Sequence, residues 1–336
     1  MQKLRIGYKM KINVSKFLKK LNILLLLLCV VLLSACTAAD DTADSERLNV
    51  VTVNFAQYDF ARAVCGDSAD VQMIMRPGAE VHGYEPSLSD IIAIENADVF
   101  VYGGGTGDVW VDKILSSINT DGITLVPLME YSEISLYKEE AHASLHNHSE
   151  HDHHHHEGTG AYDEHIWTSP KNAMRIVDII EQTVSDLDPG NKETYNKNAS
   201  GYINRLLAID MELTNAIAGA DSKFIAVADR FPFLYMAKDY GLEYAAAFSG
   251  CSPESDAGPS VIAHMIEEIN HHGTKAVFHI ELSNRKMADA ICEHTGAKKL
   301  LLHSCQSISR DDFENGVTYA DLMEQNVTNL KEALGL

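Results

Sequence analysis

Short apolar segments alternate with helical patterns along most of the chain. Each half contains four apolar runs with the length of buried strands, and amphipathic stretches separate them. Ser87 and Asp90 have the spacing of a capping box at the start of one such helix. This βαβ rhythm predicts two parallel sheets with helices on their faces. The predicted strands cover residues 48–53, 71–75, 97–103, 123–128, 223–228, 243–248, 275–281 and 298–303.

Two longer helical patterns occupy the middle of the chain, at about 170–186 and 192–218, and the turn sequence DPGN separates them. We interpret the second as a rigid linker helix, although one more packed helix would show the same pattern. The predicted fold is α/β, with two βα lobes that each hold a parallel four-stranded sheet, and ligands are expected in the cleft between the lobes. The predicted parts are an N-terminal lobe at 48–190, the linker helix at 191–219 and a C-terminal lobe at 220–336.

The N-terminus has the pattern of a lipoprotein signal peptide. Residues 1–20 carry seven Lys or Arg and no acid, and the apolar run that follows is too short for a transmembrane helix. The run ends in LSAC, which resembles the lipobox of bacterial lipoproteins, although ordinary signal-peptidase cleavage would leave Cys36 incidental. We expect a signal peptide at 1–35, lipid on Cys36, an acidic flexible tether at 36–47, and an extracytoplasmic location.

The mature chain is strongly acidic. Removal of the leader leaves 20 Lys and Arg against 48 Asp and Glu, a net charge of −28. Such a surface repels nucleic acid and attracts cations, so we expect no nucleic-acid partner. No C-x-x-C motif is present, which excludes a cysteine-based zinc finger. The remaining cysteines allow a disulfide in an oxidising compartment, but their spacing does not say which pair forms it.

Half of the sixteen histidines lie in one short acidic stretch. A purification tag, a polar spacer or a device that handles metal would each produce such a run, but its irregular spacing and internal position disfavour a tag. The residues are His142, His146, His148, His151, His153, His154, His155 and His156.

The other histidines differ in their sequence context. His82, His165 and His303 each lie after a predicted strand or before a helix, where a cleft residue would lie. His279 lies inside a predicted strand and suits a core position. The remaining four lie in helical or loop patterns where no nearby motif indicates a partner, and they are interpreted as surface residues: His264, His271, His272 and His294.

Four motifs follow one another along the mature chain: MRPGAEVHGYEPSLSDI, DEHIWTSPKNA, FLYMAKDYGL and TYADLMEQNVTNL. In this order they resemble segments of the metal-binding lipoproteins of bacterial zinc and manganese ABC importers. The first two resemble that family's Gly-x-x-x-His-x-Tyr-x-Pro and Asp-Pro-His-x-Trp stretches. The sequence GGGTGDVW stands in the place of the family's Gly-rich loop, and it lacks the G-x-G-x-x-G spacing of dinucleotide binding.

This resemblance implies a monomeric binding protein, not an enzyme, that delivers zinc to the permease of an ABC importer. His82 and His165 match the first two family ligands. Arg230 occupies the third position, normally His or Glu, and it has no lone pair for a metal. His303 matches the fourth position. We therefore predict a Zn(II) site made by the three histidines, with Glu281 or water as the fourth ligand.

The resemblance also bears on the surroundings of this site. We expect Arg230 to pair with Glu281 or Asp229, because a charge in a closing cleft needs a partner. A disulfide between Cys251 and Cys305, known in some zinc-binding members, would hold the loop of His303. The ligand set disfavours manganese and calcium, whereas copper or nickel would compete by affinity.

Two other functions match parts of the same pattern. Three histidines with an open position describe a zinc hydrolase, but the chain has no H-E-x-x-H motif and no general base apart from Glu281. A surface adhesin or a metal store would use the His-rich stretch itself as the working part. In the zinc branch of the family a similar His-rich loop occurs at this place, which favours zinc as the cargo.

Deletion of residues 141–160 tests the role of the His-rich stretch. We expect the deletion variant to keep one tight zinc site and to lose several weak ones, because scattered imidazoles and carboxylates bind zinc weakly. Isothermal titration of the variant and of the intact protein measures both classes of site. Loss of the tight site in the deletion variant would place the main site in this stretch.

Overall fold

The computed structural model describes residues 47–79, 84–139, 161–250 and 258–336. Its first sheet is parallel and has the strand order β2-β1-β3-β4. Every residue of the central strand β3 is buried, as expected for a parallel sheet that is covered on both faces. The strands are β1 (Leu48–Thr52), β2 (Ala69–Met73), β3 (Val99–Tyr102) and β4 (Thr124–Pro127).

The second sheet repeats this plan with the parallel order β6-β5-β7-β8. Its register shifts between Val227 and Arg230, near the end of the central strand β5. The two predicted four-stranded sheets are therefore confirmed, with small differences in strand bounds. The strands are β5 (Phe224–Phe231), β6 (Glu243–Ser249), β7 (Ala276–His279) and β8 (Lys298–Leu301).

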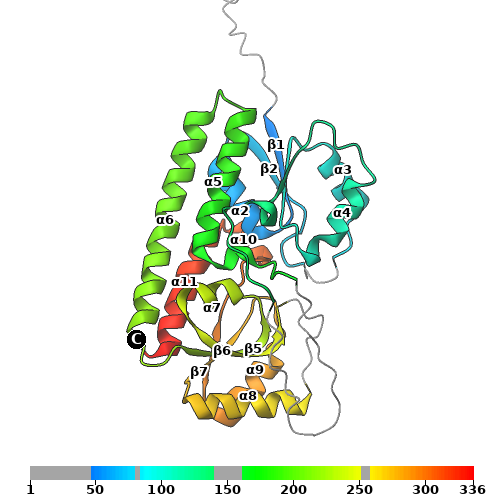
Figure 1. The fold of residues 1–336 in the computed structure, drawn as a ribbon. Helices are drawn as coiled ribbons and strands as arrows, with labels where there is room; N and C mark the ends of the chain where they lie inside the picture. Colours follow the sequence, from blue (N-terminus) through cyan, green and yellow to red (C-terminus); the bar gives the residue numbers. More distant parts are fainter. Residues whose placement is uncertain (1–46, 80–83, 140–160, 251–257) are drawn as a thin grey trace, which may run out of the picture. The chain divides into compact units, whose positions relative to one another are not determined.

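Helices cover both faces of the first sheet (Figure 1). α3 (Leu88–Glu95) and α4 (Val109–Leu115) pack over one apolar cluster, whereas α2 (Phe55–Cys65) and α5 (Pro170–Leu187) belong to another. The predicted capping box is confirmed, since the backbone N–H of Ser87 donates to the Asp90 carboxylate at 2.7 Å. Short 3-10 turns lie at η1 (Thr106–Asp108), η2 (Leu128–Glu130) and η3 (Ile166–Thr168).

The second sheet is covered in the same way. α7 (Leu234–Tyr240) and α11 (Tyr319–Leu334) share the larger apolar cluster with α2 and α5, and α8 (Pro259–His272) and α9 (Lys286–Thr295) pack over a separate one. A short helix, α10 (Arg310–Glu314), precedes α11. Because one cluster continues from the helices of one sheet to those of the other, residues 47–336 form a single compact unit that contains both sheets.

The long helix α6 (Lys192–Gly219) contacts helices of both sheets. It runs beside α5 and beside α11 in Figure 1. Near its start the Asn198 amide donates to the Val64 carbonyl at 3.1 Å, and farther along Asp210 accepts from the Tyr240 hydroxyl at 2.7 Å. The predicted helix at 191–219 is confirmed, and its rigidity stays a prediction.

A buried carboxylate joins three of these helices. Asp59 on α2 is 1% exposed, and its Oδ2 accepts from the Tyr202 hydroxyl of α6 at 2.5 Å and from the Tyr319 backbone N–H of α11 at 2.9 Å. Its Oδ1 accepts from Arg62 at 2.6 Å. Such a carboxylate is costly to bury without partners, so these contacts fix how the helices meet.

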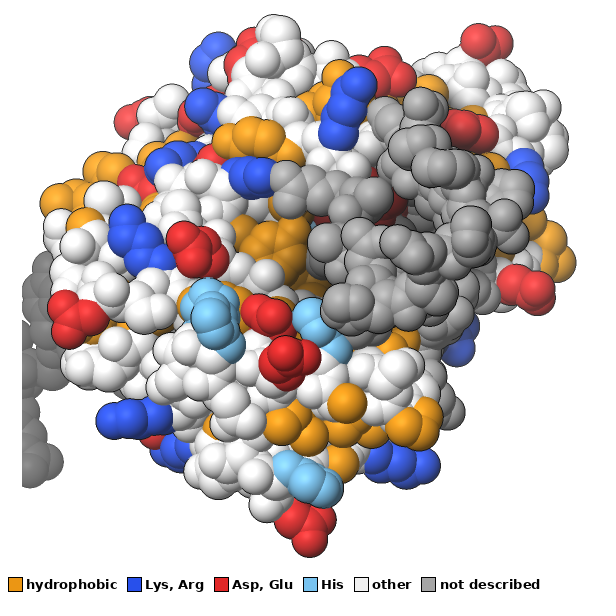
Figure 2. Space-filling view, turned by 60° about the horizontal axis from the view of Figure 1, so that its bottom comes forward, with side chains coloured by type: hydrophobic (Ala, Val, Ile, Leu, Met, Phe, Trp, Pro, Cys, Tyr) orange, Lys and Arg blue, Asp and Glu red, His pale blue; other side chains and the backbone are white. Residues whose placement is uncertain are grey.

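The histidines interpreted as surface or core residues agree with their positions only in part, because His264 and His272 are half-buried and the His272 ring stacks on Phe224 with the ring centroids 3.8 Å apart. His271 and His294 are exposed, whereas His279 is 6% exposed and its Nδ1 lies 2.9 Å from the Ile280 carbonyl oxygen. Figure 2 shows histidine side chains spread over one face among acidic ones. None of the helices in the described ranges is long and apolar enough to span a bilayer.

Replacement of Asp59 by Ala tests the junction of α2, α6 and α11. We expect the free energy of unfolding to fall by about 3 kcal/mol, because the substitution leaves a buried hydroxyl and a buried N–H without an acceptor. Chemical denaturation measures the change. Asp70→Ala is the matched control, since it removes the same charge from an exposed ion pair with Arg47 and should change stability by less than about 1 kcal/mol. Equal effects of the two variants would contradict this role of Asp59.

Candidate metal centre

His165 has the environment of a metal ligand. Its side chain is fully buried at the start of η3, and its Nδ1 lies 3.1 Å from Asp163 Oδ1, which also accepts from the His165 backbone N–H at 2.8 Å. A carboxylate at Nδ1 holds the proton there and leaves a lone pair on Nε2. Nε2 is buried and has no hydrogen-bond partner among the described residues. A cation at this atom would satisfy it.

Two opposing effects act on the proton affinity of His165. Burial lowers the pKa of the imidazole, whereas the charge and hydrogen bond of Asp163, together with the charges of Glu164 and Glu139, raise it, and the net pKa lies above its ordinary value. The negative surroundings favour a positive charge on or beside the ring. A proton therefore competes with a metal ion for Nε2.

Gly250 allows the backbone to approach this ring closely. A Cβ atom at position 250 would lie 3.4 Å from His165 Cε1, 3.3 Å from Asp163 Oδ2 and only 2.9 Å from the Phe231 carbonyl oxygen. Because the backbone oxygen cannot move away as a flexible side chain can, only glycine fits at this position without a shift of β5. Gly250 therefore forms the wall behind His165.

Hydrogen bonds from several elements fix the segment that carries His165. The Trp167 indole N–H donates to the Ser304 carbonyl at 2.9 Å, and the Tyr319 hydroxyl donates to the Trp167 carbonyl at 2.6 Å. On α7, the Tyr235 hydroxyl donates to the Asp163 carbonyl at 2.6 Å. These donors and acceptors are buried, so the position of His165 is set by both halves of the chain.

His303 is buried but is engaged by its own loop. It is 5% exposed, and its Nδ1 accepts from the Cys305 backbone N–H at 3.0 Å. A backbone N–H is always a donor, so the neutral ring carries its proton on Nε2, which then lacks a lone pair for a metal. His303 would have to give up this hydrogen bond to act as a ligand, and its ligand role stays a prediction.

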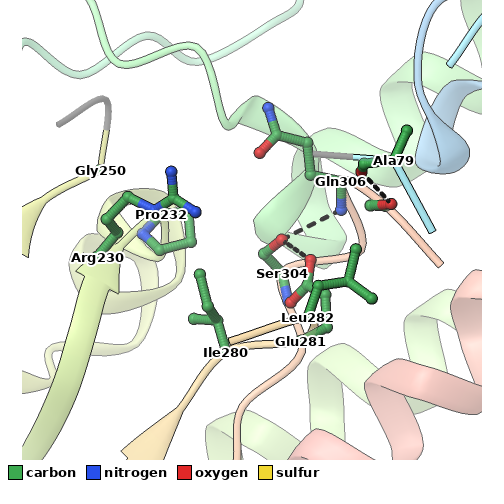
Figure 3. A pocket seen from close by; sticks show the side chains of 10 residues that line it. Ala79, Arg230, Pro232, Gly250, Ile280, Glu281, Leu282, Ser304 and Gln306 are labelled. Carbon is green, nitrogen blue, oxygen red and sulfur yellow. Dashed lines mark hydrogen bonds between the residues drawn. The ribbon is translucent and has the colours of Figure 1, made fainter. Parts of the chain in front are cut away.

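Glu281 is also engaged. Its Oε2 accepts from the Ser304 backbone N–H at 2.8 Å, its Oε1 accepts from the Ser304 hydroxyl, and its Oε2 lies 3.8 Å from His303 Nδ1. Glu281 and Ser304 line a cavity of about 30 Å³ together with Gln306 and Arg230. Figure 3 shows Arg230 on one wall and the other three residues opposite it.

The expected pairing of the Arg230 guanidinium with Glu281 or Asp229 stays a prediction. Arg230 and Glu281 line the same cavity, and Asp229 Oδ1 accepts from the backbone N–H of Arg230 at 3.0 Å. Within the described ranges, no three His, Cys, Asp or Glu side chains converge into a group that could hold a metal ion. His165, His303 and Glu281 therefore do not form such a group by themselves.

Other predicted residues lie outside the described residues, namely His82, Cys36, Cys251 and the eight histidines of the His-rich stretch. Cys305 is described, and it carries a free, fully buried thiol whose pKa burial raises well above its usual value. Its φ of 61° is unusual for a residue other than glycine. The disulfide with Cys251 stays a prediction.

The Gly-rich loop holds a carboxylate and not a nucleotide phosphate. The backbone N–H of Gly107 donates to Glu164, the residue before His165, and a Cβ at Gly107 would collide with the Glu164 carboxylate. Asp108 Oδ2 accepts from the Gly103 N–H at 2.8 Å. Burial raises the pKa of Asp108 to about 6, and the nearby charge of Glu164 adds to the shift although the loop N–H groups oppose it.

The sequence interpretation missed Asp163, Gly250 and Gln306. Asp163 carried a usable signal, because a carboxylate two residues before a candidate ligand histidine is well placed to orient its ring. Gly250 and Gln306 reach the site only through the arrangement of β6 and of the segment after β8, which local patterns do not encode.

Known proteins resemble this chain over most of its length. The profile of the family described as zinc-uptake complex component A, periplasmic, matches residues 50–333. The zinc-binding lipoprotein AdcA of Streptococcus pneumoniae serotype 4 is 31% identical over 315 residues, which cover 94% of this chain and 61% of AdcA. The high-affinity zinc uptake system protein ZnuA of Bacillus subtilis is 31% identical over 310 residues, which cover 91% of this chain and 95% of that protein.

The fold agrees with these matches. The crystal structure of the Zn(II)-bound ZnuA-like domain of S. pneumoniae AdcA superposes with a TM-score of 0.70 at 27% identity, over 86% of this chain and 100% of that domain. The chain spans less than two thirds of the length of AdcA and nearly all of the Bacillus protein.

Replacement of Asp163 by Asn tests whether this carboxylate prepares His165 for a metal ion. We expect zinc affinity to fall about 10–100-fold, because the amide no longer holds the proton on Nδ1 or raises the basicity of the ring. Competition with a chromophoric chelator measures the affinity. Asp210→Asn, at a half-buried carboxylate of α6 that accepts from the Tyr240 hydroxyl at 2.7 Å, is the matched control and should keep the affinity of the unchanged protein. An Asp163 variant with unchanged affinity would contradict the role.

Proposed function

We propose that this chain, which belongs to the family of zinc-uptake complex component A (ZnuA), binds Zn(II) outside the cytoplasmic membrane and delivers it to an ABC permease. The observation that carries the proposal is the buried Nε2 of His165, which has a lone pair and, within the described ranges, no hydrogen-bond partner, while a carboxylate lies at the Nδ1 side of the ring. This is the usual preparation of a histidine that binds zinc.

The surroundings of His165 support a cation as the ligand. Asp163, Glu164 and Glu139 all act on the imidazole with negative charge. A site that combines an imidazole nitrogen with carboxylate oxygens suits zinc better than it suits manganese or calcium, because those two ions prefer more oxygen ligands. The zinc-binding names of the relatives agree with this chemistry.

His165 is the ligand that we propose first, and His82 remains the predicted ligand from the first lobe. His303 already accepts a hydrogen bond from the Cys305 N–H, and Glu281 already accepts one from the Ser304 N–H. We therefore propose that these two residues shape the cleft wall and contribute less to zinc affinity than His165 does.

The remaining parts of the proposal come from the sequence. Lipid on Cys36 would hold the protein at the outer side of the membrane, close to the permease, and the acidic tether would let it move there as a monomer. The His-rich stretch would collect zinc through many weak contacts before the ion reaches the cleft. The Cys251–Cys305 disulfide would fix the segment that follows β8.

A hydrolase is disfavoured by the state of Glu281. The carboxylate was the one general base that the sequence offered, and both of its oxygens accept hydrogen bonds from Ser304. A base whose oxygens are both occupied in this way is poorly placed to accept a proton from a metal-bound water. Binding and transfer of the ion is therefore the function that we propose.

A zinc titration of four proteins tests the proposal. We expect the unchanged protein to bind one zinc ion tightly. Loss of a group that only orients a ligand lowers metal affinity about 10–100-fold, and we expect His165→Ala to lower zinc affinity by more than this because it removes the ligand itself. His303→Ala should lose less. His294→Ala, at an exposed histidine of α9, is the matched control and should bind as the unchanged protein does. Chelator competition and calorimetry give the affinities and the stoichiometry.

Several outcomes would contradict parts of the proposal. Absence of tight one-to-one binding by the unchanged protein would reject zinc capture. Equal affinity of His165→Ala and the unchanged protein would reject the ligand assignment. Normal growth of a strain without the protein under zinc starvation would favour an adhesin or a metal store instead.

A further inference from the structure

Two chain segments pair beside His165 and place carboxylates on one face. Lys138 and Tyr162 form an antiparallel bridge, the Asp163 N–H donates to the Tyr137 carbonyl at 2.9 Å, and the Glu139 N–H donates to the Ala161 carbonyl at 2.9 Å. Side chains alternate between the two faces of such a pair. The side chains of Glu139 and Asp163 therefore lie on the same face, as diagonal neighbours.

A small cavity confirms this arrangement. Glu139 and Asp163 both line a space of about 10 Å³, and Gly250 and Ser249 form part of its wall. The His165 ring lies directly behind that wall, because a Cβ on Gly250 would be 3.4 Å from His165 Cε1. Glu139 is also one of the carboxylates whose charge acts on the imidazole. The two carboxylates therefore line one cavity, and the imidazole lies next to its Gly250 wall.

The buried polar atoms without partners point to a cation here. Among the described residues, the buried side-chain atoms that lack a hydrogen bond include one imidazole nitrogen, His165 Nε2, and one carboxylate oxygen, Glu139 Oε1. Both atoms carry lone pairs, so neither can satisfy the other with a hydrogen bond unless a proton is added. A metal ion between them would satisfy both at once.

We propose that Glu139 is an oxygen ligand of the ion that His165 binds. This inference rests on the proposed function. Glu139 takes the part that the sequence assigned to Glu281, because the Glu281 oxygens accept from Ser304 whereas Glu139 Oε1 has no donor in the described part of the chain. Two ligands from described residues also agree with the finding that no group of three converges there. Glu139 compensates for Arg230, which cannot ligate.

The substitution Glu139→Gln tests the proposal, since it keeps the size of the side chain and removes its charge. We expect zinc affinity to fall at least about tenfold and the visible spectrum of the Co(II)-loaded protein to change, because an oxygen ligand is lost. Glu130→Gln is the matched control, because Glu130 belongs to η2, away from the cavity lining, and this variant should keep the Co(II) spectrum of the unchanged protein. Glu281→Gln is the comparison variant that tests the alternative oxygen ligand.

The outcomes separate this proposal from the proposed function. If Glu139→Gln and the unchanged protein bind zinc equally and give the same Co(II) spectrum, Glu139 is not a ligand, although zinc capture stands. If Glu139→Gln raises the melting temperature and leaves the zinc affinity unchanged, the residue shares a proton with Asp163 and the proposal is overturned. If the unchanged protein binds no zinc, both proposals fail. A change of spectrum for Glu281→Gln alone would return the ligand role to Glu281.

Discussion

The hydrogen bond from the Trp167 indole to the Ser304 carbonyl is the contact on which the candidate centre depends. It joins the segment of His165 to the segment after β8, and both groups are buried, so the bond is made without competition from water. Ser304 in turn holds the Glu281 carboxylate. The Trp167 indole N–H therefore sets the distance between the His165 imidazole and the cleft wall that Glu281 and Gln306 form.

This contact is supported by a second buried network farther from the cleft. The Tyr319 hydroxyl donates to the Trp167 carbonyl, and the Tyr319 N–H donates to Asp59, which also accepts from Tyr202 on α6. The long helix and the C-terminal helix thus meet at one carboxylate. A displacement of α6 or α11 would leave buried polar groups unpaired, and that cost resists movement of the His165 segment relative to the two sheets.

The two sheets, the capping box of α3 and the helix at 191–219 were predictable, because strand and helix periodicity are written in adjacent residues. The candidate ligand His165 was found through a local motif. The surroundings of its ring could not be predicted, because strand pairing between distant segments places Gly250 against the ring and Glu139 beside Asp163. The contact between the Cys305 N–H and His303 Nδ1 is local, but it depends on the backbone conformation of this turn, where Cys305 has a φ of 61°, and residue type does not encode that conformation.

Residue type alone therefore does not decide which side chains bind a metal. Glu281 and Glu139 are the same chemical group, but the first accepts from two donors of Ser304, whereas the second has a buried oxygen to which no described residue donates. His303 and His165 differ in the same way, since one ring accepts at Nδ1 and the other donates there. A metal ion competes with existing hydrogen bonds for each lone pair, so the atoms left without a donor are the ones that gain most from it. By this criterion His165 and Glu139 are the ligands that we propose, and an oxygen ligand from another segment would explain why arginine is tolerated at the third family position.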